Sequence, residues 1–297
     1  MSAWTEHLVA CIRSACRLEV LSPKPGNVCP GFSFSDASVE DFLVSADAIA
    51  PVLAQTSELG VGPAIRRAVE RTQEAVGHNT NLGIVLLLAP LAAVPEQVPL
   101  LDGTGAVCRG LTVDDSTEAY RAISLASPGG LADVKEQPVA QQPDIDLREC
   151  MRLAAARDLI AAQYVTDFRD VLQHGVWSLL HTEEWDEVGD QRLAWLAVNM
   201  LATRGDTLIR RKCGDAINYD VQRRALALLQ TGWPHERLSQ SHYDEFDAFL
   251  RDSEHRRNPG TTADMIAAVL FAVLRSGICR CDNDRLEFVR DRNVQSV

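Results

Sequence analysis

The feature that most constrains the fold of this chain is a helical spacing of apolar residues that recurs along most of its length. In one of the clearest stretches Leu147, Met151, Ala155, Leu159 and Ala162 follow at steps of four, four, four and three. This spacing places them in one stripe on a helix surface. We therefore predict one core-facing helix over residues 147–162.

The same periodicity predicts helices elsewhere and leaves little room for strands. Alternating runs bounded by turns are scarce, and aromatic residues make up only 6% of the chain. The sequence therefore predicts an all-α fold. Further helical windows cover residues 4–20, 38–55, 61–77, 80–94, 113–126, 166–181, 190–203, 215–231, 243–253 and 262–275.

The 297 residues suffice for about two domains of ~150 residues or for one large helical domain. We predict one multi-helix globular domain over residues 1–276, followed by a polar tail or short peripheral helix over 277–297. The stretch Ser127–Asp144 is rich in Pro, Gly and Gln, which predicts a long loop between two helical blocks.

The charge balance limits the classes of ligand. With 29 Lys and Arg against 41 Asp and Glu, the net charge is −12, which disfavours binding along a nucleic-acid backbone. Two compact basic clusters remain, Arg210–Lys212 and His255–Arg257. They suit a small phosphorylated ligand better than a polymer, although both clusters are also compatible with solvated helix ends.

Neither export nor a membrane span is expected. The longest apolar runs, Leu82–Val94 and Ala263–Leu274, are shorter than the ~20 residues that cross a bilayer. The amino-terminal stretch contains Glu6 and Arg13 and lacks the pattern of a secretory signal. We expect a cytoplasmic protein whose eight cysteines are reduced thiols.

The common nucleotide-binding motifs are absent. There is no P-loop pattern, and Gly103, Gly105 and Gly110 do not have the spacing of a dinucleotide-binding loop. A nucleotide, if bound, must be bound by another arrangement.

Four polar segments interrupt the apolar helices: Glu19–Asn27, Gly77–Gly83, Asp206–Lys212 and Asn258–Asp264. The second and fourth segments open directly into apolar helices. Free N–H groups and the positive end of the helix dipole point out of a helix amino terminus, so both segments have the layout of a phosphate site. We expect the four segments, at helix termini, to line one central cleft.

Simpler roles are open for the helix starts. Thr261 and Asp264 have the spacing of a capping pair, which stabilises a helix by about 1 kcal/mol without any ligand. Asn79 and Asn81 are equally suited to be ordinary helix caps.

Simple ion pairs are the corresponding alternative for the other two segments. Glu19 and Lys24 suit an exposed salt bridge, although Pro23 and Pro25 would hold the Lys24 ammonium in place. Asp206 and Arg210 are four residues apart, as in a surface pair worth about 0.3 to 0.5 kcal/mol.

Taken together, the four segments resemble a known family. The motifs, in chain order, are Glu19-Val with Pro23-Lys-Pro-Gly26, Asn79-Thr80 with Gly83, Asp206-Thr-Leu, and Pro259-Gly with Ala263-Asp264. Their order and separations, over roughly residues 15–275, resemble the triphosphoribosyl-dephospho-CoA synthases. The resemblance implies an all-α, Mg²⁺-dependent transferase that uses ATP and 3′-dephospho-CoA and releases adenine. Such enzymes make the precursor of the prosthetic group of citrate lyase and malonate decarboxylase acyl carrier proteins.

The chain also departs from the family pattern. It reads Pro-Gly-Asn-Val-Cys29 where the family usually continues Pro-Gly-Leu-Val-Asp, and it lacks the His-containing stretch that follows there. It reads Asn-Thr-Asn-Leu-Gly83 where many members have Asn-Thr-His-Lys-Gly. The chain is therefore more similar to a divergent branch known beside genes for methanopterin-dependent one-carbon metabolism, and the acceptor is dephospho-CoA or a related cofactor precursor.

Ribosyl transfer from ATP requires carboxylates, because the transition state resembles an oxocarbenium ion and the departing base needs a proton. Asp264 is a candidate catalytic residue and, with Asp206, a candidate Mg²⁺ ligand. Glu19 is the candidate for activating the acceptor hydroxyl, with Asp41 as the alternative.

A second group of residues is expected to hold the triphosphate and ribose. Arg210, Arg211 and Lys212 are candidates for the phosphate oxygens, but successive helix positions differ by about 100°, so we do not expect all three to face the site. The other candidate substrate- and phosphate-binding residues are Lys24, Asn79, Thr80, Asn81, Asn258, Gly260 and Thr261.

Two other functions stay open: another ATP-dependent transfer in methanopterin- or methanofuran-linked cofactor synthesis, and a non-catalytic helical nucleotide-binding protein. In every case we expect small-molecule partners, no nucleic acid and no membrane, with a homodimer as the alternative to a monomer.

Overall fold

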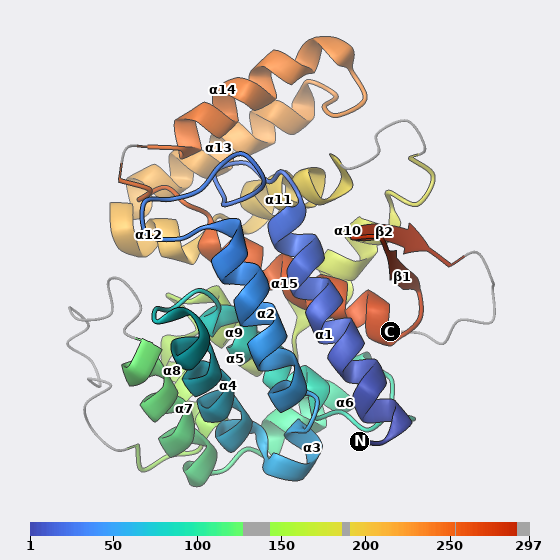
Figure 1. The fold of residues 1–297 in the computed structure, drawn as a ribbon. Helices are drawn as coiled ribbons and strands as arrows, with labels where there is room; N and C mark the ends of the chain where they lie inside the picture. Colours follow the sequence, from blue (N-terminus) through green and yellow to red (C-terminus); the bar gives the residue numbers. More distant parts are fainter. Residues whose placement is uncertain (127–142, 186–190, 253, 290–297) are drawn as a thin grey trace.

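The computed structural model describes residues 1–126, 143–185, 191–252 and 254–289 and is predominantly helical (Figure 1). A two-stranded hairpin is formed by β1 (Cys279–Asp282) and β2 (Arg285–Phe288). The helices are α1 (Ala3–Leu21), α2 (Val39–Leu53), α3 (Thr56–Leu59), α4 (Val61–Val76), α5 (Leu82–Ala92), α6 (Leu100–Arg109), α7 (Val113–Ala126), α8 (Leu147–Ala154), α9 (Leu159–Val165), the π-helix η1 (Asp170–Gly175), α10 (Val176–Leu180), α11 (Gln191–Arg204), α12 (Thr207–Cys213), α13 (Asp215–Gln230), the 3₁₀ turn η2 (Arg237–Ser239), α14 (Gln240–Leu250) and α15 (Gly260–Arg275).

The all-α prediction is confirmed. Every window predicted from the periodicity contains a helix. The short helices α3, α6 and α12 were not among those windows. The long loop predicted over Ser127–Asp144 lies outside the described residues, except for its last two. In the parts of the chain that the structure describes, no helix combines the length and apolarity needed to cross a membrane.

The single helix predicted over residues 147–162 is two helices in the structure. Helix α8 ends at Ala154, and α9 begins at Leu159. Asp158 separates them because its carboxylate accepts hydrogen bonds from the N–H groups of Ile160 and Ala161, as an N-cap. The apolar stripe continues across the break, which is why periodicity alone does not reveal it.

Residues 279–288 form the β-hairpin where the sequence predicted a tail or a peripheral helix. Asn283 and Asp284 occupy the turn with φ of 48° and 59°, the backbone of a two-residue hairpin turn, which Asn and Asp tolerate better than most residues. Arg17 of α1 holds the turn through two 2.8 Å hydrogen bonds to Asp284.

Helix α15 is the centre of the main core and is buried continuously from Met265 to Leu274. Helices α1, α5, α11 and η1 pack around it, and Figure 1 shows it passing through the middle of the molecule. A second apolar cluster lies between α11, α12, α13 and α14, with Trp233 and Leu250 among its buried members. Helix α14 therefore packs on a different cluster from the main core, to which α1 belongs.

Helix α5 is apolar on all sides because it is buried on all sides. Pro90 within it has no N–H, so the carbonyl of Leu86, four residues earlier, has no partner in the helix. The hydroxyl of the fully buried Tyr164 donates to that carbonyl at 2.6 Å. This bond supplies the donor that Pro90 lacks and connects α9 to α5.

Candidate active site

A cavity of about 700 Å³ opens between the helix ends, and all four polar segments contribute to its wall. Helices α5 and α15 direct their amino termini to it through Leu82 and Gly260. The predicted site residues that line it are Glu19, Asn79, Thr80, Asn81, Arg210, Arg211, Lys212, Asn258, Gly260, Thr261 and Asp264. Most of the residues proposed from the sequence are thus brought together around one cavity.

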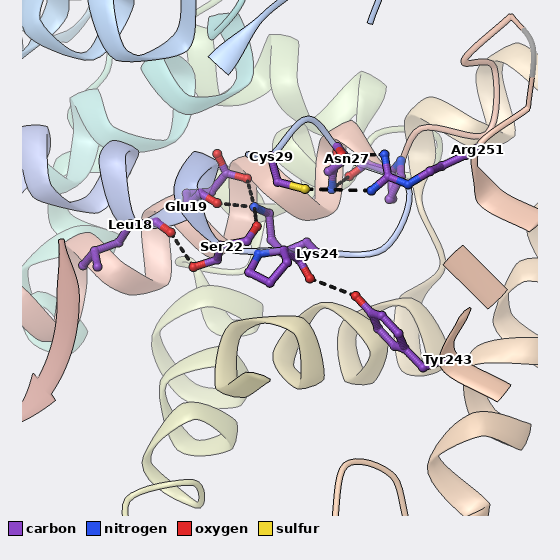
Figure 2. Close-up of polar contacts among 10 residues, drawn as sticks. Leu18, Glu19, Ser22, Lys24, Asn27, Cys29, Tyr243 and Arg251 are labelled. Carbon is purple, nitrogen blue, oxygen red and sulfur yellow. Dashed lines mark hydrogen bonds and ion pairs between the residues drawn. The ribbon is translucent and has the colours of Figure 1, made fainter. Parts of the chain in front are cut away.

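Glu19 and Lys24 form a buried ion pair at the end of α1 (Figure 2). The Lys24 Nζ lies 2.9 Å from Glu19 Oε1, and it also donates to the carbonyls of Glu19 and Ser22. Pro23 and Pro25 fold the chain back so that Lys24, which is 0% exposed, points to the helix end that precedes it.

Lys24 is therefore not available for the expected contact with phosphate. An ammonium has three donors, and the three acceptors around Nζ take them all. Lys24 is also not among the described residues that line the cavity, whereas Glu19 is. In this structure Lys24 orients the Glu19 carboxylate, and the pair is buried where the simpler alternative was an exposed salt bridge.

Asp264 lies in the second turn of α15 and faces the cavity. Burial raises the pKa of its carboxyl well above the usual value, and the nearby carboxylates of Glu19, Asp206 and Asp158 raise it further, against the opposing hydrogen bond from the Ile84 N–H. The alternative role as a helix cap does not apply, because α15 begins at Gly260 with Pro259 as its N-cap.

Asn79, Thr80 and Asn81 all line the cavity but differ in their contacts. Asn79 Oδ1 accepts from the N–H groups of Asn81 and Leu82, so it caps the start of α5. Thr80 shares a 2.6 Å hydrogen bond with Ser45 of α2. Asn81 is only 4% exposed and accepts from Thr72 through Oδ1, and its Nδ2 has no partner among the described residues.

Asp206 is fully buried and is not among the described lining residues. Its Oδ1 accepts from the N–H groups of Leu208 and Ile209 as the N-cap of α12, and its Oδ2 accepts from both the N–H and the hydroxyl of Thr262 at 2.8 Å. Burial raises the pKa of Asp206 despite these donors. Asp206 therefore joins α12 to α15. Four donors already occupy both of its oxygens, so the carboxylate is not available as the expected metal ligand.

All three basic residues at the end of α12 contribute to the cavity wall, more than helix geometry led us to expect. Arg210 is nevertheless partly engaged by the protein: it donates to the Ala156 carbonyl at 3.1 Å and pairs with Asp215 at 3.4 Å. The alternative pair with Asp206 does not form. Arg256 donates to the carbonyl of Lys212, so the loop before α15 is attached to the end of α12.

Asp41 differs from its expected role. Its Oδ2 accepts from the N–H and hydroxyl of Ser38 at 2.8 Å, which completes a capping box at the start of α2. Those two hydrogen bonds lower the pKa of Asp41. It is not among the described residues that line the cavity, so Glu19 is better placed than Asp41 for a catalytic role.

Several lining residues were not predicted from the sequence. Asp158 enters the wall because it caps α9 at the break described above. Phe34 and His255 stack at 4.2 Å between ring centroids, on the loop before α2 and the loop before α15. His255 has φ of 51°, which is uncommon for a residue other than glycine. The sequence offered only its place in a basic cluster as a signal.

The cavity also has an apolar wall. It is formed by side chains of α2, α5, α7, α8 and α9. These side chains are apolar or aromatic, whereas those at the end of α12 are cationic. The residues of the apolar wall are Phe42, Leu86, Tyr120, Ile123, Met151 and Ile160.

Three cavity-lining residues carry a buried polar atom without a partner in the described structure. They are Asn81 Nδ2, His255 Nδ1 and Asn258 Oδ1. An unpaired buried donor or acceptor costs about 1 to 3 kcal/mol. A polar group that reached these atoms would recover this cost.

The chain matches the family described as ATP:dephospho-CoA triphosphoribosyl transferase over residues 5–280. Among solved structures it is similar to a protein from Archaeoglobus fulgidus assigned as a triphosphoribosyl-dephospho-CoA synthase, with a TM-score of 0.62 and 25% identity. That similarity covers 79% of this chain and 99% of the other. A search of curated proteins found no match. Since the family match spans nearly the whole chain, including all the segments that form the cavity, the protein belongs to the ATP:dephospho-CoA triphosphoribosyl transferase family.

Proposed function

We propose that this protein transfers the triphosphoribosyl group of ATP to a hydroxyl of dephospho-CoA or of a related cofactor precursor, with release of adenine. Family membership supports the reaction type. The single observation that carries the proposal is the cavity itself, which places cationic side chains, two helix amino termini, carboxylates and unpaired polar atoms in one wall.

The proposed reaction breaks the bond between the anomeric carbon and the adenine nitrogen and forms a bond to the acceptor oxygen. The acceptor hydroxyl loses a proton and the departing adenine gains one, so the atoms balance. The positive charge that develops on the ribose is stabilised by a nearby carboxylate. The cavity wall therefore needs a proton donor for the adenine and a carboxylate that accepts the hydroxyl proton and lies near the developing charge.

Asp264 and Glu19 are the carboxyl groups proposed for these two tasks. The raised pKa of Asp264 favours a protonated carboxyl, which suits donation to the departing base. Glu19, oriented by Lys24, is the proposed acceptor of the hydroxyl proton. General acid or base assistance contributes about 10²- to 10⁴-fold in rate.

The triphosphate is proposed to lie along α12 and the amino termini of α5 and α15. Arg211 and Lys212 supply positive charge, and the amino termini of α5 and α15 add the positive ends of their helix dipoles. The apolar wall beside Tyr120 and Met151 suits the base or the apolar arm of the acceptor.

Mg²⁺ would be bound with the phosphates. Among the described residues no three His, Cys, Asp or Glu side chains are grouped to hold a metal alone. The residues present fit instead a Mg²⁺ that takes one or two carboxylates and several phosphate oxygens, as is usual for this ion. Glu19, whose Oε1 is paired with Lys24, is the candidate carboxylate. Asp264, the other expected ligand, is instead protonated in its proposed role as proton donor. Bound there, Mg²⁺ would neutralise triphosphate charge.

The test is incubation of the purified protein with ATP, Mg²⁺ and dephospho-CoA, with free adenine measured by chromatography and the product by mass spectrometry. The proposal expects adenine and a product carrying the acceptor plus the triphosphoribosyl group. Release of ADP or AMP would contradict it. Adenine release with a pterin or furan precursor alone would change the acceptor, and ATP binding without turnover would indicate a non-catalytic role.

A further inference from the structure

The segment between α1 and α2, residues 22–38, contributes to the cavity wall. It has no regular secondary structure apart from turns and an isolated bridge between Cys29 and Phe32. It contains Lys24, and Asn27, Val28 and Phe34 line the cavity. Its internal backbone hydrogen bonds join only residues two or three positions apart, so contacts with other elements are needed to fix its position.

The carboxyl end of α14 supplies those contacts through one charged pair, formed by Asp247 in the helix and its C-cap residue Arg251. Arg251 Nε lies 3.0 and 2.8 Å from the two Asp247 oxygens, and the side chains are only 16% and 19% exposed. Asp247 Oδ1 accepts the Gly26 N–H at 2.7 Å. Arg251 donates to the Asn27 carbonyl at 2.9 Å (Figure 2).

The guanidinium of Arg251 makes two further contacts with the same segment. Its carbon lies 4.1 Å from the centre of the Phe32 ring, and its second terminal nitrogen lies 4.0 Å from the Cys29 sulfur. One planar side chain therefore meets a carboxylate, a carbonyl, a thiol and an aromatic face, which a lysine ammonium at this position could not do at once.

Gly26 allows α14 to pack closely against this segment. Gly26 has φ of 75°, and a Cβ at this position would lie 2.6 Å from the Cβ of Leu250 on α14. Glycine therefore serves both the turn and the approach of the helix. Tyr243 adds a 2.8 Å hydrogen bond to the Pro23 carbonyl (Figure 2).

Neither Asp247 nor Arg251 is among the described residues that line the cavity. Yet they join a loop attached to α1, in the main core, to α14, in the second cluster. Any shift of this pair would move Asn27 and the Lys24 turn, and through Lys24 the Glu19 carboxylate.

We infer that Asp247 and Arg251 are positioning residues for the active site: they hold residues 23–32 on α14, and so place the Glu19–Lys24 pair and Asn27 for the substrate. The inference rests on the proposed function. Misplacing reacting groups by about 1 Å costs on the order of 100-fold in rate, so a loosened pair should affect turnover far more than stability.

The test compares Arg251→Lys with Arg224→Lys in the full-length protein. Arg224 is a matched control, since it bonds Asp220 at 2.8 Å and stacks on Phe249 at 4.1 Å in the same cluster without touching the loop. Adenine release should fall about 10- to 100-fold in kcat/KM for Arg251→Lys, with kcat reduced, and stay near wild type for Arg224→Lys. Assays are run well below the lowest Tm.

Equal kcat values for the two variants, with equal losses of Tm, would overturn the inference, because the pair would then be only structural. Tyr243→Phe provides a milder second variant that keeps the ring and removes one hydrogen bond to the loop. It should lower kcat by a smaller factor than Arg251→Lys does. Unchanged kinetics in both Arg251→Lys and Tyr243→Phe would also reject the inference.

Failure of the proposed function is separable from failure of this inference. If the wild-type protein releases no adenine, the function is wrong, and ATP affinity by calorimetry becomes the readout for Arg251→Lys. A weaker affinity than in Arg224→Lys would still support the positioning role, and equal affinity would reject it.

Discussion

The Asp264 carboxylate occupies the space that a side chain at Gly83 would need: a Cβ built on Gly83 would overlap both Oδ2 and Cγ of Asp264. The amino-terminal turns of α5 and α15 can therefore approach closely only because residue 83 is glycine. This contact gives a physical reason for the glycine in the second polar segment and links it to the catalytic candidate in the fourth.

Gly83→Ala should displace the Asp264 carboxyl and lower kcat by on the order of 100-fold, since sub-ångström placement of the reacting groups is lost. The measurement is adenine release at saturating ATP. Gly110→Ala is the control, because a Cβ there makes only ordinary contacts at 3.5 and 3.6 Å. A Gly83→Ala variant with wild-type kcat would show that the position of Asp264 does not limit the reaction.

Asp264→Asn should abolish most activity, by about 10²- to 10⁴-fold, while Tm at neutral pH stays equal or rises. Because burial raises the pKa of Asp264 above its usual 3.8, the folded state holds a proton that the unfolded state has lost. Stability therefore falls as pH rises above about 4 toward the folded pKa. The variant should show a flatter dependence of Tm on pH by calorimetry. A steeper dependence, or retained activity, would contradict the assigned role.

Lys24→Met should destabilise the protein by about 3 to 5 kcal/mol, because it leaves the buried Glu19 carboxylate without its partner. The free energy of unfolding is measured by urea denaturation. The double variant Glu19→Gln with Lys24→Met should recover part of that loss, since the uncompensated charge is then removed. Simple additivity of the two single changes would mean that the ion pair is not coupled as described.

Tyr164→Phe should cost about 1 to 3 kcal/mol of stability, because the Leu86 carbonyl that Pro90 cannot pair would lose its only donor among the described residues. Urea denaturation again provides the measurement. Tyr219→Phe, at an exposed position on α13, should change the free energy of unfolding by less than about 0.5 kcal/mol. Equal effects of the two changes would argue against a stabilising role for the hydrogen bond from Tyr164 to the Leu86 carbonyl.

The sequence predicted the helical class and most of the helices because both depend on a spacing of 3.6 residues that is visible locally. Local spacing also accounts for Thr112 and Asp115, which stand three residues apart as in a capping box and are joined by three hydrogen bonds. It did not reveal the break at Asp158, since an N-cap inside a continuous apolar stripe leaves the periodicity intact.

By itself, then, the sequence determined the fold class and the order of the four polar segments, because both depend on local spacing and on residue types at helix ends. Only the tertiary structure decided which side chains of those segments face the cavity. Lys24 turns to Glu19 and Asp206 to Thr262, while Asp158 and His255 join the wall. The physical reason is that a buried charge points toward whichever partner the packing of distant helices places beside it, and no spacing along the chain encodes that choice.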